Sequence, residues 1–213
     1  MQKTFVKTSQ HYFKFLVNEF GFILKIVMES PRGEPWEGML QYGTDTTLVD
    51  INCTRGEIPS LAIGRAKDGN NYMLPIQVIY EYMSLSPDEK RTILSISEAS
   101  QAVTILSRKQ LVRDIPQSTS AEEKQELILD AYAKYLREHI FFLLQGDFSR
   151  WKEFWEYHVS KLTTENARAG RSEFVPVVVT DDNGQFKVIG KQHVFQKGLD
   201  YINQLKDEQD ISK

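Results

Sequence analysis

Between residues 22 and 63 the chain runs through four short apolar stretches that are separated by turns and leave no room for long helical crossovers. The pattern is clearest where Thr47, Val49, Ile51 and Cys53 alternate along one face of a strand. Parallel strands need long crossover connections, whereas antiparallel strands can follow one another through turns. The sequence therefore predicts an antiparallel meander, with strands at 22–29, 36–42, 46–53 and 58–63.

Helical patterns flank these strands. Apolar spacing over 11–20 predicts a helix with Ser9 as its N-cap and Gly21 at its end. The most strongly patterned helix begins at the capping box Ser120-Ala121-Glu122-Glu123 and is predicted to extend to about Gln145. Other helices are predicted over 75–83, from Ser86, within 95–112, from Asp147 or Ser149 to Leu162, and over 194–205.

The valine-rich stretch 174–180, the turn residues Asp181-Asp182-Asn183-Gly184 and the apolar stretch 186–189 predict a β-hairpin. We therefore expect an α+β fold, in which an antiparallel meander near the N-terminus packs with helices. A long antiparallel helix pair and a C-terminal hairpin complete it. The expected division is a sheet-containing part at 1–115 and a helix pair with hairpin at 116–213, together forming one compact unit.

Composition narrows the class of protein. Charged residues make up 26% of the chain and the formal net charge is −3, so the basic excess typical of nucleic-acid binders is absent. Cys53 is the only cysteine, which excludes an intrachain disulfide and a multi-cysteine zinc site. No apolar run approaches the length of a membrane span, and the first residues do not resemble a secretion signal. We expect a cytoplasmic protein that binds neither nucleic acid nor membrane.

Two histidines are the first candidates for chemistry. His139 and His158 lie on the helices predicted to pair, so they could approach one another and, with Glu138, bind a metal. The alternative is that they are semi-buried members of a helix interface, because isolated histidines rarely act as ligands without orienting partners. We assign no catalytic, metal or cofactor-binding residue and expect no cofactor.

The remaining polar candidates have structural explanations. Cys53 in an alternating strand is typical of a small buried hydrophobe rather than a nucleophile. The carboxylates of residues 122–126 favour a helix N-terminus, and those at 181–182 belong to a turn. The glycines match no phosphate-binding pattern.

The aromatic residues Trp151, Phe154 and Trp155 form the most unusual local feature. Core packing is one interpretation, because large aromatic side chains dominate buried area. The other is a partner-binding surface, since aromatic residues are enriched at interface hot spots and one helix cannot easily bury all of them. These three residues are our candidates for contact with a partner.

Short sequence motifs in three parts of the chain resemble those of a widespread group of small uncharacterised bacterial domains. These motifs lie within residues 12–22, 40–63 and 132–148. Among them are Phe20-Gly21-Phe22, Arg55-Gly56-Glu57 and Gly146-Asp147-Phe148. Many such domains are similar to immunity proteins, which neutralise the secreted toxins of competing bacteria. The resemblance implies a protein-binding protein with a toxin-like partner, and it transfers no functional residue to this chain.

Three functions follow as hypotheses. The first is a non-enzymatic, immunity-like binding protein that acts through a sheet face or an aromatic helix surface. The second is an enzyme whose site is assembled from dispersed histidines and carboxylates. The third is a self-associating structural subunit. The sequence leaves the oligomeric state open.

Overall fold

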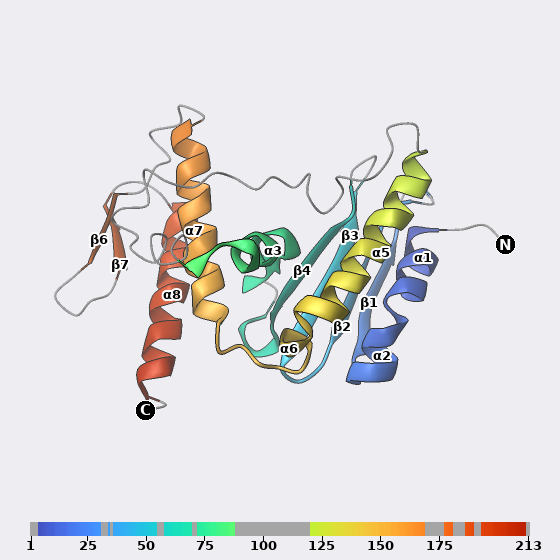
Figure 1. Cartoon of the computed structure of the whole chain (residues 1–213), viewed down its shortest axis with the longest axis horizontal. Helices are drawn as coiled ribbons and strands as arrows, with labels where there is room; N and C mark the ends of the chain where they lie inside the picture. The colour runs from blue at the N-terminus through green and yellow to red at the C-terminus, as the bar shows by residue number, and fades with distance from the viewer. Residues whose placement is uncertain are drawn as a thin grey trace. The chain divides into compact units, whose positions relative to one another are not determined.

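The computed structural model of the chain divides into two compact units (Figure 1). Unit 1 comprises residues 1–77 and 106–148, and unit 2 comprises residues 78–105 and 149–213. This division differs from the predicted boundary at residue 115, because the helix that begins at Ala121 belongs to the same unit as the N-terminal sheet. The structure describes residues 4–30, 34, 36–54, 58–69, 72–87, 120–168, 177–180, 186–189 and 193–211.

Unit 1 is built on a five-stranded antiparallel sheet in which every strand pairs with its neighbour in the chain, in the order β1-β2-β3-β4-β5. The predicted four-stranded meander and the α+β class are therefore confirmed, and the sheet has a fifth strand, β5, that was not predicted. A short connection keeps successive antiparallel strands adjacent, which is why turns alone were enough to predict this order. The strands are β1 (Ile23–Glu29), β2 (Gly38–Gly43), β3 (Thr47–Cys53), β4 (Ser60–Arg65) and β5 (Leu74–Pro75), with a 3-10 turn η1 (Ala66–Asp68) after β4.

Two short helices precede the sheet, α1 (Phe5–Tyr12) and α2 (Lys14–Phe20). Thr4 caps α1 by accepting a hydrogen bond from the Lys7 amide, whereas Ser9 lies inside α1 and is fully buried. The prediction of Ser9 as an N-cap is therefore wrong, because α1 begins at Phe5, and the single helix predicted over 11–20 is interrupted at Phe13. Gly21 ends α2 as predicted, with a φ of 69° in the left-handed region that favours glycine.

The helix from the Ser120 capping box is confirmed as α5 (Ala121–His139). The Ser120 hydroxyl accepts from the Glu123 amide, and the Glu123 carboxylate accepts from the Ser120 amide. The predicted continuation to Gln145 is interrupted at Ile140, after which α6 (Phe141–Leu144) follows. The Thr47 hydroxyl donates to the Leu143 carbonyl at 2.9 Å, so β3 supplies a partner where this helical segment ends.

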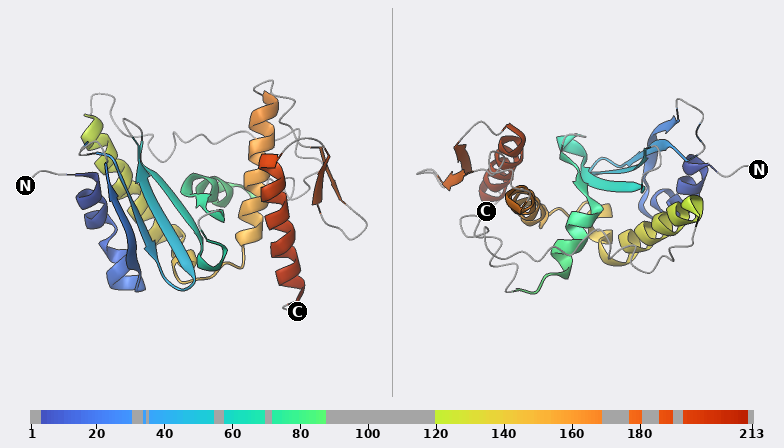
Figure 2. Two further views of the ribbon diagram at one scale, coloured as in Figure 1. Left: turned by 180° about the vertical axis from the view of Figure 1, so that it is seen from behind. Right: turned by 90° about the horizontal axis from the view of Figure 1, so that it is seen from above.

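The helices of unit 1 cover one face of the sheet, which we call the inner face. Its core includes Leu40, Val49 and Ile51, all with no exposed surface. The Tyr132 hydroxyl of α5 donates to the Pro59 carbonyl at 3.1 Å, which joins α5 to this face. Seen from behind, the strands lie in front of α5 and no described helix of unit 1 crosses them (Figure 2, left). The opposite face is the outer face.

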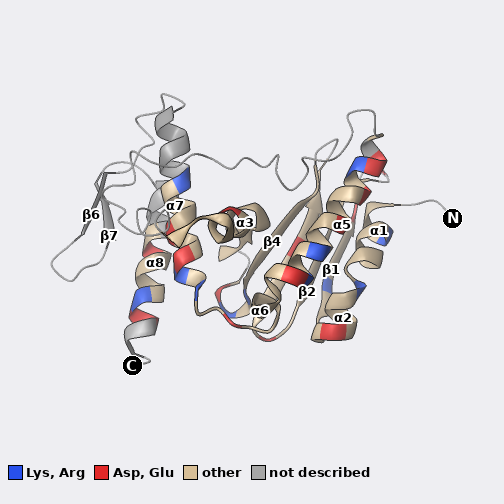
Figure 3. Cartoon of the chain, in the orientation of Figure 1, with Lys and Arg blue, Asp and Glu red and all other residues tan. Residues whose placement is uncertain are grey.

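Along α5, residues of both charges face outward (Figure 3), as a solvated helix face requires.

Unit 2 contains α7 (Trp151–Arg168), α8 (His193–Ile211) and most of α3 (Ile76–Ser84). Helix α7 packs against α8, and β6 (Val177–Thr180) pairs antiparallel with β7 (Phe186–Ile189). The turn predicted at 181–184, the helix predicted within 95–112 and all but the first two residues of the helix predicted from Ser86 lie outside the described residues. Helices α5 and α7 belong to different units, so their predicted pairing stays a prediction.

Candidate functional site

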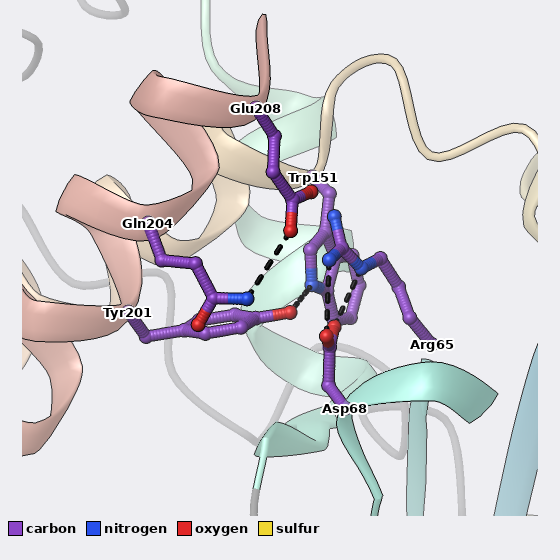
Figure 4. A network of polar contacts seen from close by, with 6 residues as sticks. All are labelled: Arg65, Asp68, Trp151, Tyr201, Gln204 and Glu208. Carbon is purple, nitrogen blue, oxygen red and sulfur yellow. Dashed lines mark hydrogen bonds and ion pairs between the residues drawn. The ribbon is translucent and has the colours of Figure 1, made fainter.

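The aromatic residues predicted to contact a partner are buried in unit 2. Trp151 and Phe154 have no exposed surface and Trp155 is 7% exposed. The Trp151 indole donates to the Tyr201 hydroxyl of α8 at 3.0 Å (Figure 4), and Phe154 meets the Tyr82 ring of α3 edge to face. Because α7 has neighbours in both α3 and α8, it buries more aromatic surface than a helix covered on one side could. These three side chains therefore offer a partner almost no exposed area.

The two candidate histidines have different surroundings. His139 ends α5 in unit 1, where its side chain is 60% exposed and its Nε2 lies 3.9 Å from a Glu138 oxygen. His158 lies on α7 in unit 2, where burial, with a smaller contribution from the charge of Lys161, lowers its pKa to about 4. Its Nδ1 is buried and has no hydrogen-bond partner among the described residues.

Within the described ranges, no group of three or more histidine, cysteine or acidic side chains has an arrangement that could hold a metal ion. Cys53 is buried on the inner face, where its sulfur accepts from the Gln125 amide nitrogen at 3.3 Å. Glu123 is engaged in the capping box of α5. The carboxylates at 181–182 lie outside the described residues.

Unit 2 contains a buried ionic cluster that was not predicted from the sequence. Glu81 of α3 is 2% exposed, and its Oε2 lies 2.6 Å from the Lys161 ammonium of α7. The Tyr157 hydroxyl donates to the same oxygen at 3.2 Å. The spacing of Tyr157 and Lys161 along one helix face was visible in the sequence, but Glu81 lies 80 positions away from Lys161. Tyr157 and Lys161 both bond to the Glu81 carboxylate, so the cluster is best explained as a buried link between α3 and α7.

The outer face of the sheet holds a polar pair between β2 and β3. The Gln41 side-chain amide donates to an Asp50 carboxylate oxygen at 2.7 Å. Burial raises the pKa of Asp50, and the hydrogen bond from Gln41 partly opposes that rise. The register places these residues directly opposite one another, so the pair fixes the alignment of β2 and β3 at this point.

Strand β1 is an edge of the sheet and carries the most concentrated exposed apolar surface among the described residues of unit 1. Ile23 is 63% exposed, Leu24 36%, Val27 46% and Met28 52%. The register with β2 places Ile23 and Met28 on the outer face and Leu24 and Val27 on the inner face. An edge strand with apolar side chains on both faces is a template for association with another chain.

A β-bulge at Lys25 interrupts the register of β1, because Leu24 pairs with Tyr42 whereas Ile26 pairs with the adjacent Gln41. The Lys25 side chain lies over Gly43 on the outer face, where the Leu48 side chain also approaches this glycine. The sequence predicted β1 but not its edge position, which only the sheet order decides. The one available signal was the run Ile26-Val27-Met28, which breaks the alternation expected of a half-buried strand.

Comparison of the chain with protein-family models, with curated proteins and with solved structures finds no match. Among the helices that the structure describes, none combines the length and the apolar character that crossing a membrane requires.

The candidate site is defined by the geometry of unit 1 alone. That site is β1 together with the adjoining outer face of the sheet, which we call the β1 surface.

Proposed function

We propose that this chain is a non-enzymatic protein-binding protein that holds its partner on the β1 surface. The observation that carries the proposal is the exposure of Ile23, Leu24, Val27 and Met28 along one sheet edge. Single exposed apolar residues are ordinary, whereas a contiguous group on an edge strand is typical of an interaction site. The proposed partner is a toxin-like protein in the cytoplasm, which follows the resemblance to immunity proteins.

The polar residues support binding rather than catalysis. Glu81 and Lys161 neutralise one another, Asp50 accepts from Gln41, and the neutral form of His158 is favoured by its burial. General acid–base catalysis needs ionisable groups that can reach a substrate. The buried ion pair is instead committed to contacts within the chain.

The predicted finer architecture belongs to the same proposal. We propose that α5 and α7 form an antiparallel pair and that residues 174–189 form a C-terminal hairpin. Neither element supplies the β1 surface, so the binding proposal does not depend on them.

A pull-down with matched variants tests the proposal. Met28→Lys places a charge on the β1 surface, and Ile58→Lys makes the same change at a residue of similar exposure, 46% against 52%, outside the strands. We expect the wild type and Ile58→Lys to retain one stoichiometric host partner, and Met28→Lys to lose it. A partner that all three proteins retain equally, or the absence of any stoichiometric partner, would refute the proposal.

A further inference from the structure

We propose that the partner contributes an extended segment that pairs with β1 as an additional antiparallel strand. In this arrangement a basic side chain of the partner faces Glu29 and an acidic side chain faces Lys25. The inference rests on the proposed function, because it specifies how the β1 surface would hold its partner.

The backbone of β1 is suited to strand addition. The seven-residue strand pairs with β2 along one edge, and no described strand pairs with its other edge. A strand in that position presents a row of amide and carbonyl groups to an incoming segment. In strand addition, the main-chain hydrogen bonds supply affinity and the alternating side chains supply specificity. On β1 those side chains are the exposed residues at 23, 24, 27 and 28.

The charges of β1 define the partner's side chains. The Lys25 ammonium has one long contact, 3.5 Å to the Thr44 carbonyl, and pairs with no carboxylate among the described residues. Glu29 likewise pairs with no cation among the described residues. Opposite charges across neighbouring strands stabilise the pairing, and like charges oppose it. A complementary partner therefore carries an acidic and a basic residue, with apolar residues between them.

The bulge fixes the spacing of those two charges. Glu29 pairs with Gly38, which faces Phe5 and Val6 of α1, so Glu29 lies on the inner face. Lys25 lies on the outer face, and the bulge places it beside Ile26 on that face. A straight partner strand meets these two charges on opposite faces. Its basic and acidic residues must therefore be an odd number of positions apart. In the register of β1 with β2, Ile26 and Glu29 pair with residues three positions apart, and Lys25 lies beside Ile26, so we expect a spacing of three.

The same bulge argues against a second copy of the chain as the partner. Antiparallel pairing of two β1 strands about Val27 would bring Lys25 opposite Glu29 of the other copy. Those two side chains lie on opposite faces, so the charges would not meet. Bulges at both ends would leave only residues 26–28 in register. Bulges and lysine residues on edge strands are known devices against self-association.

Two short peptides test this inference on the full-length protein. The first is built of valine and threonine and contains the run lysine, valine, valine, glutamate, so that the glutamate lies three positions after the lysine. The second is identical except that the two charged residues are exchanged. We expect the first peptide to bind about tenfold more tightly at low salt, as measured by fluorescence anisotropy. We expect it to protect the β1 amides from hydrogen exchange. Met28→Lys should abolish this binding, Ile58→Lys should preserve it, and Lys25→Glu should remove the preference between the peptides.

The outcomes separate this inference from the proposed function. Equal binding of the two peptides, or protection of amides outside β1, would overturn strand addition. If neither peptide binds but the host partner still requires Met28, the proposed function stands and strand addition is wrong. A dimer that forms in the absence of peptide and is lost in Met28→Lys would overturn the inference in favour of a second copy. If the wild-type protein binds neither peptide and no host partner, both proposals are wrong.

Discussion

Acidification should destabilise unit 2 through His158. Burial lowers the pKa of this imidazole from its ordinary 6.5 to about 4. Between these values the unfolded chain binds a proton that the folded chain does not bind. Stability therefore rises with pH across this window, and it is lost as the pH falls from about 6.5 to about 4.

The size of the effect follows from the same two values. The interval between 6.5 and about 4, at about 1.4 kcal/mol per pKa unit, corresponds to a loss of about 3 kcal/mol. The structural cause is the desolvated position of His158 on α7, where its ring packs against Trp155 and the Lys161 charge opposes protonation. A single domain is stabilised by about 5–15 kcal/mol in total, so this loss is large enough to measure.

Urea unfolding between pH 4 and pH 7 measures this loss. Trp36→Phe removes the tryptophan of unit 1, so that fluorescence reports the two tryptophans of unit 2. His158→Leu replaces the titratable imidazole with an apolar side chain and should remove about 3 kcal/mol of the pH dependence. His139→Leu alters an exposed histidine of unit 1 and should leave the unit 2 curve unchanged. A wild-type curve that is flat over this range, or a His158→Leu curve of equal slope, would refute the reasoning.

Three further substitutions test the internal contacts. Lys161→Met should lower the free energy of unfolding by about 3 kcal/mol, because it leaves the Glu81 carboxylate buried without a cation. Adding Glu81→Gln should recover part of this loss, and urea unfolding in a double-mutant cycle measures both effects. Ser120→Ala should cost about 1 kcal/mol in thermal unfolding by removing the cap of α5, and Ser120→Thr serves as the control. Gly21→Ala should cost about 1 kcal/mol through backbone strain at φ 69°, since no atom lies within 4 Å of the added carbon; an unchanged melting temperature would contradict this explanation.

The features predicted correctly depend on residues close together in the chain. The Ser120 cap needs only Glu123, three positions away, and Gly21 ends α2 through its own backbone conformation. The meander follows from short connections between strands. Ser9 shows the limit of such reasoning, because Thr4 offered an equally suitable hydroxyl nearer the N-terminus and the buried position of Ser9 was not visible locally.

The features missed depend on residues far apart in the chain. Trp151 and Phe154 could be core or surface until α3 and α8 were placed around α7. The partner of Lys161 lies 80 positions away, so no spacing rule could indicate it. Whether β1 is central or at an edge depends on the order of the whole sheet, which decides the candidate site.

The amino-acid sequence by itself determined β1 to β4, several helix ends and the antiparallel connectivity, because hydrogen bonding and backbone sterics act over a few residues. It did not indicate β5. Only the tertiary structure decided whether the aromatic side chains of α7 are buried, which charges are paired and which strand remains open. Those properties depend on the exclusion of water by segments distant in the chain, and local pattern carries no information about such contacts.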